Sequence, residues 1–168
     1  MMRYFASAVA AIACTSAAAA QLSAEGGPIQ IDSDSAQVLE SQRRIIYIGN
    51  VDVTQGDARL QTDRLIVNSK PPVGGGEGLS GFGPLDTIEA IGDVFYVTTE
   101  FKARGDRALY RRDSDTISLT NNVVLLRGED VAVGETLTLR VSEGVSTLDG
   151  EEGGRVRMTI QSQQPTSP

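Results

Sequence analysis

The 168-residue chain contains no histidine and no tryptophan, and its single cysteine is Cys14. Without histidine it can form no Ser-His or Cys-His nucleophile pair, and no zinc site of the usual ligands. Carboxylates do stand close together at Asp113 with Asp115 and at Glu151 with Glu152, but their Ser, Asp and Gly neighbours indicate turns. A glycosidase needs only two carboxylates, which distant parts of a chain can bring together. We nevertheless expect a protein that is not an enzyme, with no catalytic residues, no metal and no cofactor.

Apolar runs long enough to span a membrane are also missing, and the longest apolar stretch lies at the N-terminus. Arg3 precedes apolar residues 4–13, and alanines 18–20 form a small-residue cleavage site, which is the layout of a secretory signal peptide. A membrane span needs about 20 apolar residues, so this segment is too short to be one. The alternative is a lipoprotein signal acylated at Cys14, but the leucine usual three residues before such a cysteine is missing. The sequence therefore favours removal of residues 1–20.

Basic residues are scarce relative to acidic ones. Cleavage after Ala20 leaves 168 − 20 = 148 residues, with 14 basic (15 less Arg3) and 22 acidic side chains, a net charge of 14 − 22 = −8. An acidic chain is a poor partner for nucleic acid or for an anionic membrane surface. Cleavage also removes the only cysteine, so the domain must fold on its hydrophobic core without a disulfide. A length near 150 residues indicates one domain.

Apolar and polar residues alternate along most of this remaining chain, and no stretch shows an apolar period of three to four residues. Alternation is typical of strands with two unlike faces, so the sequence predicts an all-β domain over residues 28–160. We expect a flexible lead-in at 21–27 and a disordered tail at 161–168. The clearest strand pattern is residues 45–57, in which we interpret Gly49-Asn50 as a tight turn between two strands.

This pattern returns at fixed intervals. Equivalent breaks, separated by 29, 43 and 29 residues, lie at Asp34, Asp63, Asp106 and Glu135. Turn residues stand 13 positions before the last three of these, at Asn50, Asp93 and Asn122. Apolar residues match in the same register, in the sets Ile45/Ile88/Ile117, Val51/Val94/Val123, Leu65/Ala108/Leu137 and Val67/Tyr110/Leu139. The chain is therefore built from repeated antiparallel strand units of about 29 residues.

A unit of this size, holding three or four short strands, cannot bury its apolar face alone. The units must stack as an elongated β-sandwich or jelly roll, or as a β-solenoid. The middle interval is one unit plus 14 residues, and this insert falls in the Gly-rich stretch 70–84, which is expected to be a flexible loop. Residues 76–81 match G-x-G-x-x-G, but prolines flank them where a nucleotide site needs a strand and a helix.

The alternation places a set of apolar side chains inside the domain. These are Ile29, Ile31, Val38, Val51, Val53, Leu60, Leu65, Val67, Val94, Tyr96, Phe101, Tyr110, Val123, Leu125, Leu137 and Leu139. Periodicity alone does not distinguish a filled core from two sheets that splay into a groove, and both readings stay open.

Residues 101–112 carry five basic side chains and one acidic side chain in an otherwise acidic protein. Lys102 and Arg104 would share one strand face, with Phe101 and Ala103 on the other. One interpretation is a charged, solvated outer face that protects a strand edge. The other is a basic rim, formed by Lys102 and Arg104, that meets anionic headgroups at the mouth of an apolar interior.

Residues 28–34 (Pro-Ile-Gln-Ile-Asp-Ser-Asp) and 49–56 (Gly-Asn-Val-Asp-Val-Thr-Gln-Gly) resemble the LptA/OstA family of periplasmic bridge proteins of lipopolysaccharide transport. Segments 105–108 and 119–123 resemble further repeats of that family, so the likeness covers about residues 28–160. The resemblance implies an open, elongated β-jelly roll (OstA-like) whose apolar interior shelters the acyl chains of lipid A. It places Ile29 and Ile31 on the family's N-terminal strand, at one end of the groove.

The resemblance also implies partners and a location. The family pairs strands end to end with LptC-like and LptD-like β-jelly roll domains and with further copies of itself, which implies a protein of the periplasm. We thus expect a lipopolysaccharide-binding transport protein whose interior positions form a lipid-binding groove. The alternative is a secreted β-solenoid that binds or degrades polysaccharide, against which the scarcity of aromatic residues counts.

Overall fold

The structure is a computed structural model that describes residues 22, 27–72, 82–150 and 154–160. The expected signal peptide and the expected C-terminal tail lie outside these residues. Within them, no helix is long and apolar enough to cross a membrane.

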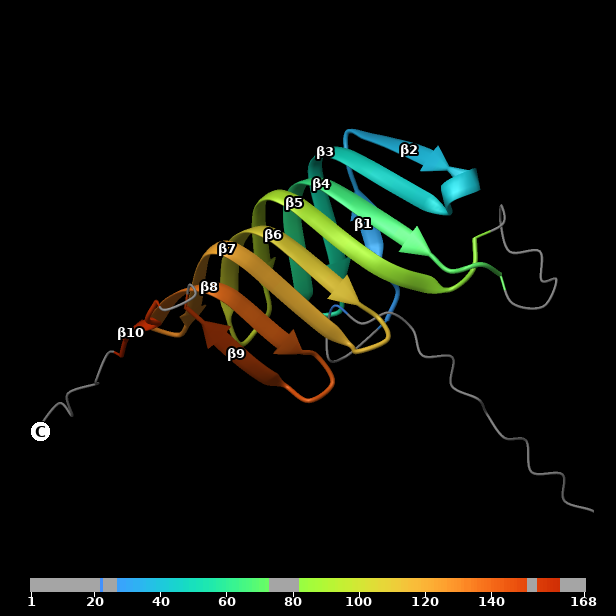
Figure 1. The fold of residues 1–168 in the computed structure, drawn as a ribbon. Coiled ribbons are helices and arrows are strands. Elements are labelled where there is room, and N and C mark those ends of the chain that lie inside the picture. The colour runs from blue at the N-terminus through green and yellow to red at the C-terminus, as the bar shows by residue number, and fades with distance from the viewer. Residues whose placement is uncertain (1–21, 23–26, 73–81, 151–153, 161–168) are drawn as a thin grey trace, which may run out of the picture.

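Ten strands form one antiparallel sheet, which confirms the all-β prediction (Figure 1). In chain order they are β1 (Gln30–Asp32), β2 (Ser35–Leu39), β3 (Arg44–Gln55), β4 (Ala58–Ser69), β5 (Leu85–Val97), β6 (Lys102–Arg111), β7 (Thr116–Arg127), β8 (Asp130–Arg140), β9 (Val145–Asp149) and β10 (Arg157–Thr159), with a single 3-10 turn, Glu40–Gln42, before β3. The central strands β3 to β8 pair in chain order. At one end both β1 and β2 pair with β3, and at the other both β9 and β10 pair with β8.

Each central strand bends near its middle, so the sheet curves over on itself and its two halves form two facing layers (Figure 1). The bends coincide with shifts in strand register, for example between Ile48 and Val51 in β3 and between Ile91 and Val94 in β5. The layers do not close into a barrel, because the strands at the two ends of the sheet do not pair with each other. The result is the open β-jelly roll that the family resemblance implies.

Gly49-Asn50 is not a tight turn between two strands, as the sequence pattern suggested, but the bend within β3. Both residues have left-handed backbones, with φ of 82° and 45°. Two consecutive left-handed residues turn the strand direction while pairing with β4 continues on either side. The equivalent pairs in β5 and β7, Gly92-Asp93 and Asn121-Asn122, also have positive φ. Gly, Asn and Asp tolerate this region best, which is why a bend looks like a hairpin turn in sequence.

An acidic side chain packs against each of these bends, from the link between β1 and β2 (Asp34), from β4 (Asp63) or from β6 (Asp106). Asn50 Nδ2 donates to Asp34 Oδ2 at 2.9 Å, and Asn122 Nδ2 donates to Asp106 Oδ2 at 2.7 Å. At Gly92 a Cβ atom would lie 2.4 Å from Asp63 Oδ2, so the carboxylate occupies the place of a side chain. We call this line of bends the crease. Three acidic residues of the sequence repeat, Asp34, Asp63 and Asp106, therefore mark the crease.

The repeating unit is a hairpin of two long, bent strands, β3–β4, β5–β6 or β7–β8, and not a group of three or four short strands. The β-solenoid alternative is wrong, because consecutive strands pair antiparallel within one sheet and do not coil. The insert joins β4 to β5, and its residues 73–81 lie outside the described part. At its base, Lys70 N–H donates to Pro84 O at 2.8 Å and Gly83 N–H to Lys70 O at 3.1 Å.

Candidate functional site: the apolar interior

Cross-strand pairing arranges the inward side chains in rows that run the length of the sheet. Residues directly opposite each other on neighbouring strands point to the same face. The first row runs from β1 to β10 through Ile31, Val53, Leu60, Tyr96, Ala103, Leu125, Ala132 and Met158. The second runs from β2 to β9 through Ala36, Tyr47, Leu65, Ala90, Ala108, Leu119, Leu137 and Leu148. The third, beside it, passes through Val38, Ile45, Val67, Ile88, Tyr110, Ile117, Leu139 and Ser146.

The structure brings the predicted interior residues together between the layers. Those buried in the core are Val51, Val53, Leu60, Leu65, Val94, Tyr96, Tyr110, Val123, Leu137 and Leu139. Those partly buried against it are Ile29, Ile31, Val67, Phe101 and Leu125. Val38 shares the third row but is 55% exposed, because β2 is the last strand of its layer and nothing described covers it. The expected burial of Val38 is therefore wrong.

The middle of the interior is packed, whereas its C-terminal end is open. Leu65, Leu119 and Leu137 have no exposed surface. Toward β9 and β10 the layers separate around a cavity of about 440 Å³. Its apolar lining includes Leu125, Ala132, Leu137, Leu148, Val156 and Met158, which come from both layers. Filled core and open groove, which the sequence could not separate, thus occur in different parts of one interior.

A second opening lies between the hairpin ends of the two layers. This pocket, which we call the mouth, holds about 130 Å³ and is lined by residues that include Tyr96, Phe101, Arg127, Arg140 and Val145. The Tyr96 and Phe101 ring centroids are 5.7 Å apart, with the ring planes inclined at 52°. The Arg127 guanidinium lies 6.0 Å from the Phe101 centroid. Cationic side chains therefore do stand at the mouth, but they are Arg127 and Arg140.

The basic rim predicted at Lys102 and Arg104 lies on the other face. Ala103 is buried, so its neighbours Lys102 and Arg104 point outward from β6. Arg104 donates to Asp93 at 2.9 Å and lies 5.2 Å from the Phe95 ring centroid. The headgroup-rim interpretation is wrong for Arg104, and the alternative of a charged outer face describes it. Asp52 and Arg59 also point outward and form an ion pair on this face.

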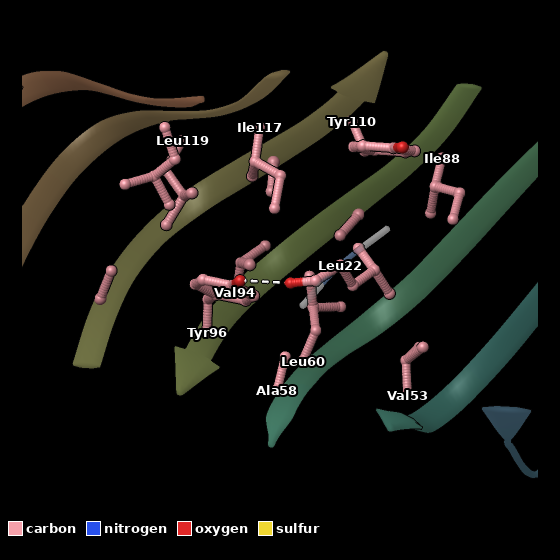
Figure 2. Close-up of a cluster of buried hydrophobic side chains, with 14 of the residues drawn as sticks. Leu22, Val53, Ala58, Leu60, Ile88, Val94, Tyr96, Tyr110, Ile117 and Leu119 are labelled. Atoms are coloured by element: carbon pink, nitrogen blue, oxygen red, sulfur yellow. Dashed lines mark hydrogen bonds between the residues drawn. The ribbon is translucent and has the colours of Figure 1, made fainter. Parts of the chain in front are cut away.

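The polar side chains of Gln55 and Tyr96 are buried in the interior, and both bind backbone of the N-terminal segment; Figure 2 shows the contact between Tyr96 and Leu22. Gln55 is 1% exposed and Tyr96 3% exposed. Gln55 Oε1 accepts the Leu22 N–H, Gln55 Nε2 donates to Gly27 O at 2.8 Å, and the Tyr96 hydroxyl donates to Leu22 O at 2.5 Å. Burial, and then the negative charge of Asp57, raise the pKa of Tyr96 above its ordinary value, so it remains a donor. The expected flexible lead-in is thus wrong at Leu22, which is itself buried in the core.

Sequence reasoning missed several interior residues. The apolar ones include Ala58, Ile88, Ala90, Ala103, Ala108, Ile117, Leu119, Ala132 and Leu148. Ile88 and Ile117 lie in the register of the repeat, which was sufficient to find them. Gln55 and Leu22 gave no such signal, because a glutamine at a strand end and a lone leucine among polar residues both suggest surface. Among the described residues, no group of three or more His, Cys, Asp or Glu side chains could hold a metal ion. The interior between the two layers is therefore suited to binding an apolar ligand.

Comparison with known proteins agrees with this architecture. The profile of the family described as "LptA/(LptD N-terminal domain) LPS transport protein" matches residues 30–145. An uncharacterized protein of Rhizobium meliloti is 35% identical over 137 residues, which cover 81% of this chain and 72% of that protein. The lipopolysaccharide export system protein LptA of Escherichia coli K12 is 27% identical over 134 residues, 79% of this chain and 70% of LptA.

Two further proteins resemble this chain. The LPS-assembly protein LptD of Salmonella choleraesuis is 30% identical over 80 residues, which are 48% of this chain but 9% of LptD. The crystal structure of LptH, the LptA homologue of Pseudomonas aeruginosa, superposes with a TM-score of 0.65 over 80% of this chain and 96% of LptH. At 20% identity this match shows a shared fold.

Proposed function

We propose, from the premise that this chain belongs to the LptA/(LptD N-terminal domain) family of lipopolysaccharide transport proteins, that it shelters lipid A acyl chains in its interior and bridges inner- and outer-membrane components in the periplasm. The observation that carries the proposal is the set of apolar rows, which extend to both ends of the sheet. At the C-terminal end they line a cavity that is open and apolar.

The energetics favour an enclosed path for such a cargo. Burying one CH₂ group is worth about 0.8 kcal/mol, so a chain of about twelve carbons gains on the order of 10 kcal/mol. A carrier that left such chains in water would lose that free energy. Acyl burial must dominate the affinity, because the acidic protein repels phosphorylated headgroups, and at the mouth Arg127 and Arg140 are balanced by Asp57 and Glu100.

The ends of the sheet suit assembly with similar domains. An unpaired strand edge is a template for another strand, and among the described residues both the β1/β2 and the β9/β10 ends present one. Apolar side chains are exposed beside the second edge, including Met158 at 60% and Ile160 at 68%. Unlike ends that pair head to tail give open filaments, and the partners would be copies of this chain and LptC-like and LptD-like domains.

Photo-crosslinking to lipopolysaccharide tests the interior as the lipid site. Two phenylalanines on the β5–β6 hairpin form a matched pair: Phe101 packs against the core at the mouth, and Phe95 is exposed on the outer face. With p-benzoylphenylalanine at each position in turn, lipid labelling is expected at Phe101 and Met158 but not at Phe95. Equal labelling at Phe95 and Phe101 would contradict the assignment.

Light scattering over a range of protein concentrations tests assembly. Met158→Lys places a charge in the apolar end of the sheet and is expected to reduce self-association. Ile91→Lys, at a 38% exposed position on the outer face of a central strand, is the control and should associate like the parent chain. Filaments that form without any lipid labelling would favour instead an adaptor that uses only its strand edges.

A further inference from the structure

The outer face of one layer carries an exposed apolar strip over β7 and β8. Leu126 and Val133 are 40% and 44% exposed there, and Val124, the cross-strand neighbour of Val133, is partly buried. The residues beside them in sequence, Leu125 and Ala132, face the interior, so these three side chains point to the opposite face. Both strands are hydrogen-bonded on their two sides, to β6 and to β10. The strip is therefore a surface of the sheet and not an edge.

Basic side chains border this strip on both sides. Arg104 of β6 pairs with Val124, and Lys102 of the same strand points to the same face. On the far side, Arg157 of β10 pairs with Val133. From β6 to β10 these two rows contain no acidic side chain, although the whole chain has 22 acidic and 15 basic ones. We call this set the outer patch: Lys102, Arg104, Val124, Leu126, Val133 and Arg157.

The positive charges of the outer patch are available to a partner. Neither Lys102 nor Arg157 forms an ion pair with another residue in the described part of the chain. Arg104 pairs with Asp93, but the two side chains are 55% and 65% exposed. An ion pair so exposed contributes little to stability and is easily exchanged for another. The outer patch thus complements an apolar surface that carries negative charge.

The dimensions of the outer patch fit an α-helix. A further strand cannot be added here, because the backbone groups of β7 and β8 are already paired on both sides. An element that packs through its side chains can cover the strip, as helices do on sheets. From β6 to β10 there are three strand spacings, about 14 Å, and a helix with its side chains is about 10–12 Å wide. A helix along β7 and β8 would place its apolar stripe on Leu126 and Val133 and its flanks beside the basic residues.

Charge argues against two other occupants. A second copy that docked through the same patch by a twofold axis would bring basic side chains against basic side chains. An anionic membrane would meet the whole face, which also carries Asp52 and Asp93. A helix as narrow as the strip meets only the basic part.

We propose that the outer patch binds an acidic amphipathic helix of a partner protein, with an apolar stripe on β7 and β8 and carboxylates beside Lys102, Arg104 and Arg157. The inference goes beyond the proposed function, because none of the six side chains faces the interior or lies on an unpaired edge. The roll can therefore hold a ligand and pair end to end while the helix is bound.

A pair of synthetic helices tests the chemistry. Each is a hydrocarbon-stapled peptide of about 14 residues with leucines spaced three and four residues apart, flanked on both sides by glutamates in one peptide and by lysines in the other. Fluorescence anisotropy with the full chain measures binding. The glutamate peptide is expected to bind at least about tenfold more tightly than the lysine peptide, and added salt should reduce the difference.

Charge reversal tests the position of the site. Lys102→Glu/Arg157→Glu should abolish the preference for the glutamate peptide. The matched control is Arg64→Glu/Arg111→Glu, which changes the net charge equally at two exposed residues on the outer face of the other layer. This control should keep the preference of the parent chain, and circular dichroism checks that both variants fold.

Truncation tests the apolar strip in the same assay. Leu126→Ala should weaken binding of the glutamate peptide severalfold. Ile91→Ala removes an equally exposed apolar side chain, at 38%, from the outer face of the other layer and should leave binding unchanged. Equal affinity of the two peptides, or equal effects of the patch and control variants, would overturn the proposal. So would phosphatidylglycerol vesicles that bind through Lys102 and Arg157 when the glutamate peptide does not.

Crosslinking in the producing cells tests for a natural partner. With p-benzoylphenylalanine at Leu126, mass spectrometry of the crosslinked stretch should give a partner segment with helical apolar spacing and flanking Asp or Glu; the same probe at Ile91 should not capture that segment. A basic segment, a second copy of this chain, or no protein at Leu126 would contradict the proposal. The lipopolysaccharide labelling at Phe101 tests the proposed function separately, since neither result depends on the other.

Discussion

Replacing Gly92 with alanine tests whether the crease depends on close packing of an acidic side chain against a left-handed backbone. Gly92 has φ of 88°, and a Cβ atom there would lie 2.4 Å from Asp63 Oδ2 and 3.1 Å from Asp63 Cβ. The left-handed backbone costs a residue with a Cβ about 1–2 kcal/mol. Moving the carboxylate away adds about 1 kcal/mol of lost packing. We therefore expect Gly92→Ala to lower the free energy of unfolding by about 2–3 kcal/mol.

Gly128 provides the matched control. It also has positive φ, 61°, but nothing lies within 4 Å of a Cβ atom built there. Gly128→Ala should therefore cost only the backbone part, about 1 kcal/mol. Urea unfolding followed by circular dichroism gives both values. The same changes should lower Tm by roughly 5–10 °C for Gly92→Ala and 2–4 °C for Gly128→Ala.

A double-mutant cycle isolates the contact with Asp63. In an Asp63→Ala background the carboxylate is gone, so Gly92→Ala should cost only about as much as Gly128→Ala in the parent chain. Two results would contradict this role of Asp63: Gly92→Ala costs no more than Gly128→Ala, or removing Asp63 leaves the cost of Gly92→Ala unchanged. Either result would mean that the acidic repeat does not shape the bend.

Other parts of the fold give further expectations. Leu119→Ala should lower the free energy of unfolding by about 2–5 kcal/mol because Leu119 is fully buried, whereas Leu126→Ala, at a 40% exposed position, should cost under about 1 kcal/mol in the same urea assay. Arg104→Ala should also cost under about 1 kcal/mol, because the Arg104–Asp93 pair is exposed on both sides, and raising the salt concentration should reduce even that. The raised pKa of Tyr96 stabilises the fold fully below the unfolded value near 10 and progressively less as the pH rises above it. Ultraviolet titration should show a tyrosine that ionises only on unfolding, and Tyr96→Phe should remove it.

Much of the interior was predictable from periodicity, because the register of the sheet reproduces the register of the repeat. Val67, Tyr110 and Leu139 match in the sequence repeat and lie in one structural row. Leu65, Ala108 and Leu137 do the same in the neighbouring row. Successive side chains along a strand point to opposite faces of the sheet, so the spacing between two residues in the sequence tells whether they share a face.

The bends were located correctly but interpreted wrongly. A hairpin turn and a bend within a strand both need left-handed residues, so Gly49-Asn50 satisfies either. What distinguishes them is whether the pairing partner continues across the break, and this is a property of β4, not of residues 49 and 50. Local sequence does not contain that information.

The predictions of a basic rim and of a flexible lead-in were wrong for a related reason. Lys102 and Arg104 were correctly placed on one face, but which face meets the interior depends on the whole sheet. Leu22 is buried because Gln55 and Tyr96, 33 and 74 residues further along the chain, bind its backbone. Only the assembled structure brings those groups together.

The crease also determines how the molecule can vary in size. One strand of each hairpin, β3, β5 or β7, carries its own left-handed pair with an acidic side chain beside it, so each hairpin brings its own bend. With strands about 4.8 Å apart, one additional hairpin would lengthen the roll by about 10 Å and leave its cross-section unchanged. The fold thus sets a width but no length, and duplication or loss of a 29-residue unit would lengthen or shorten the enclosed path in whole steps.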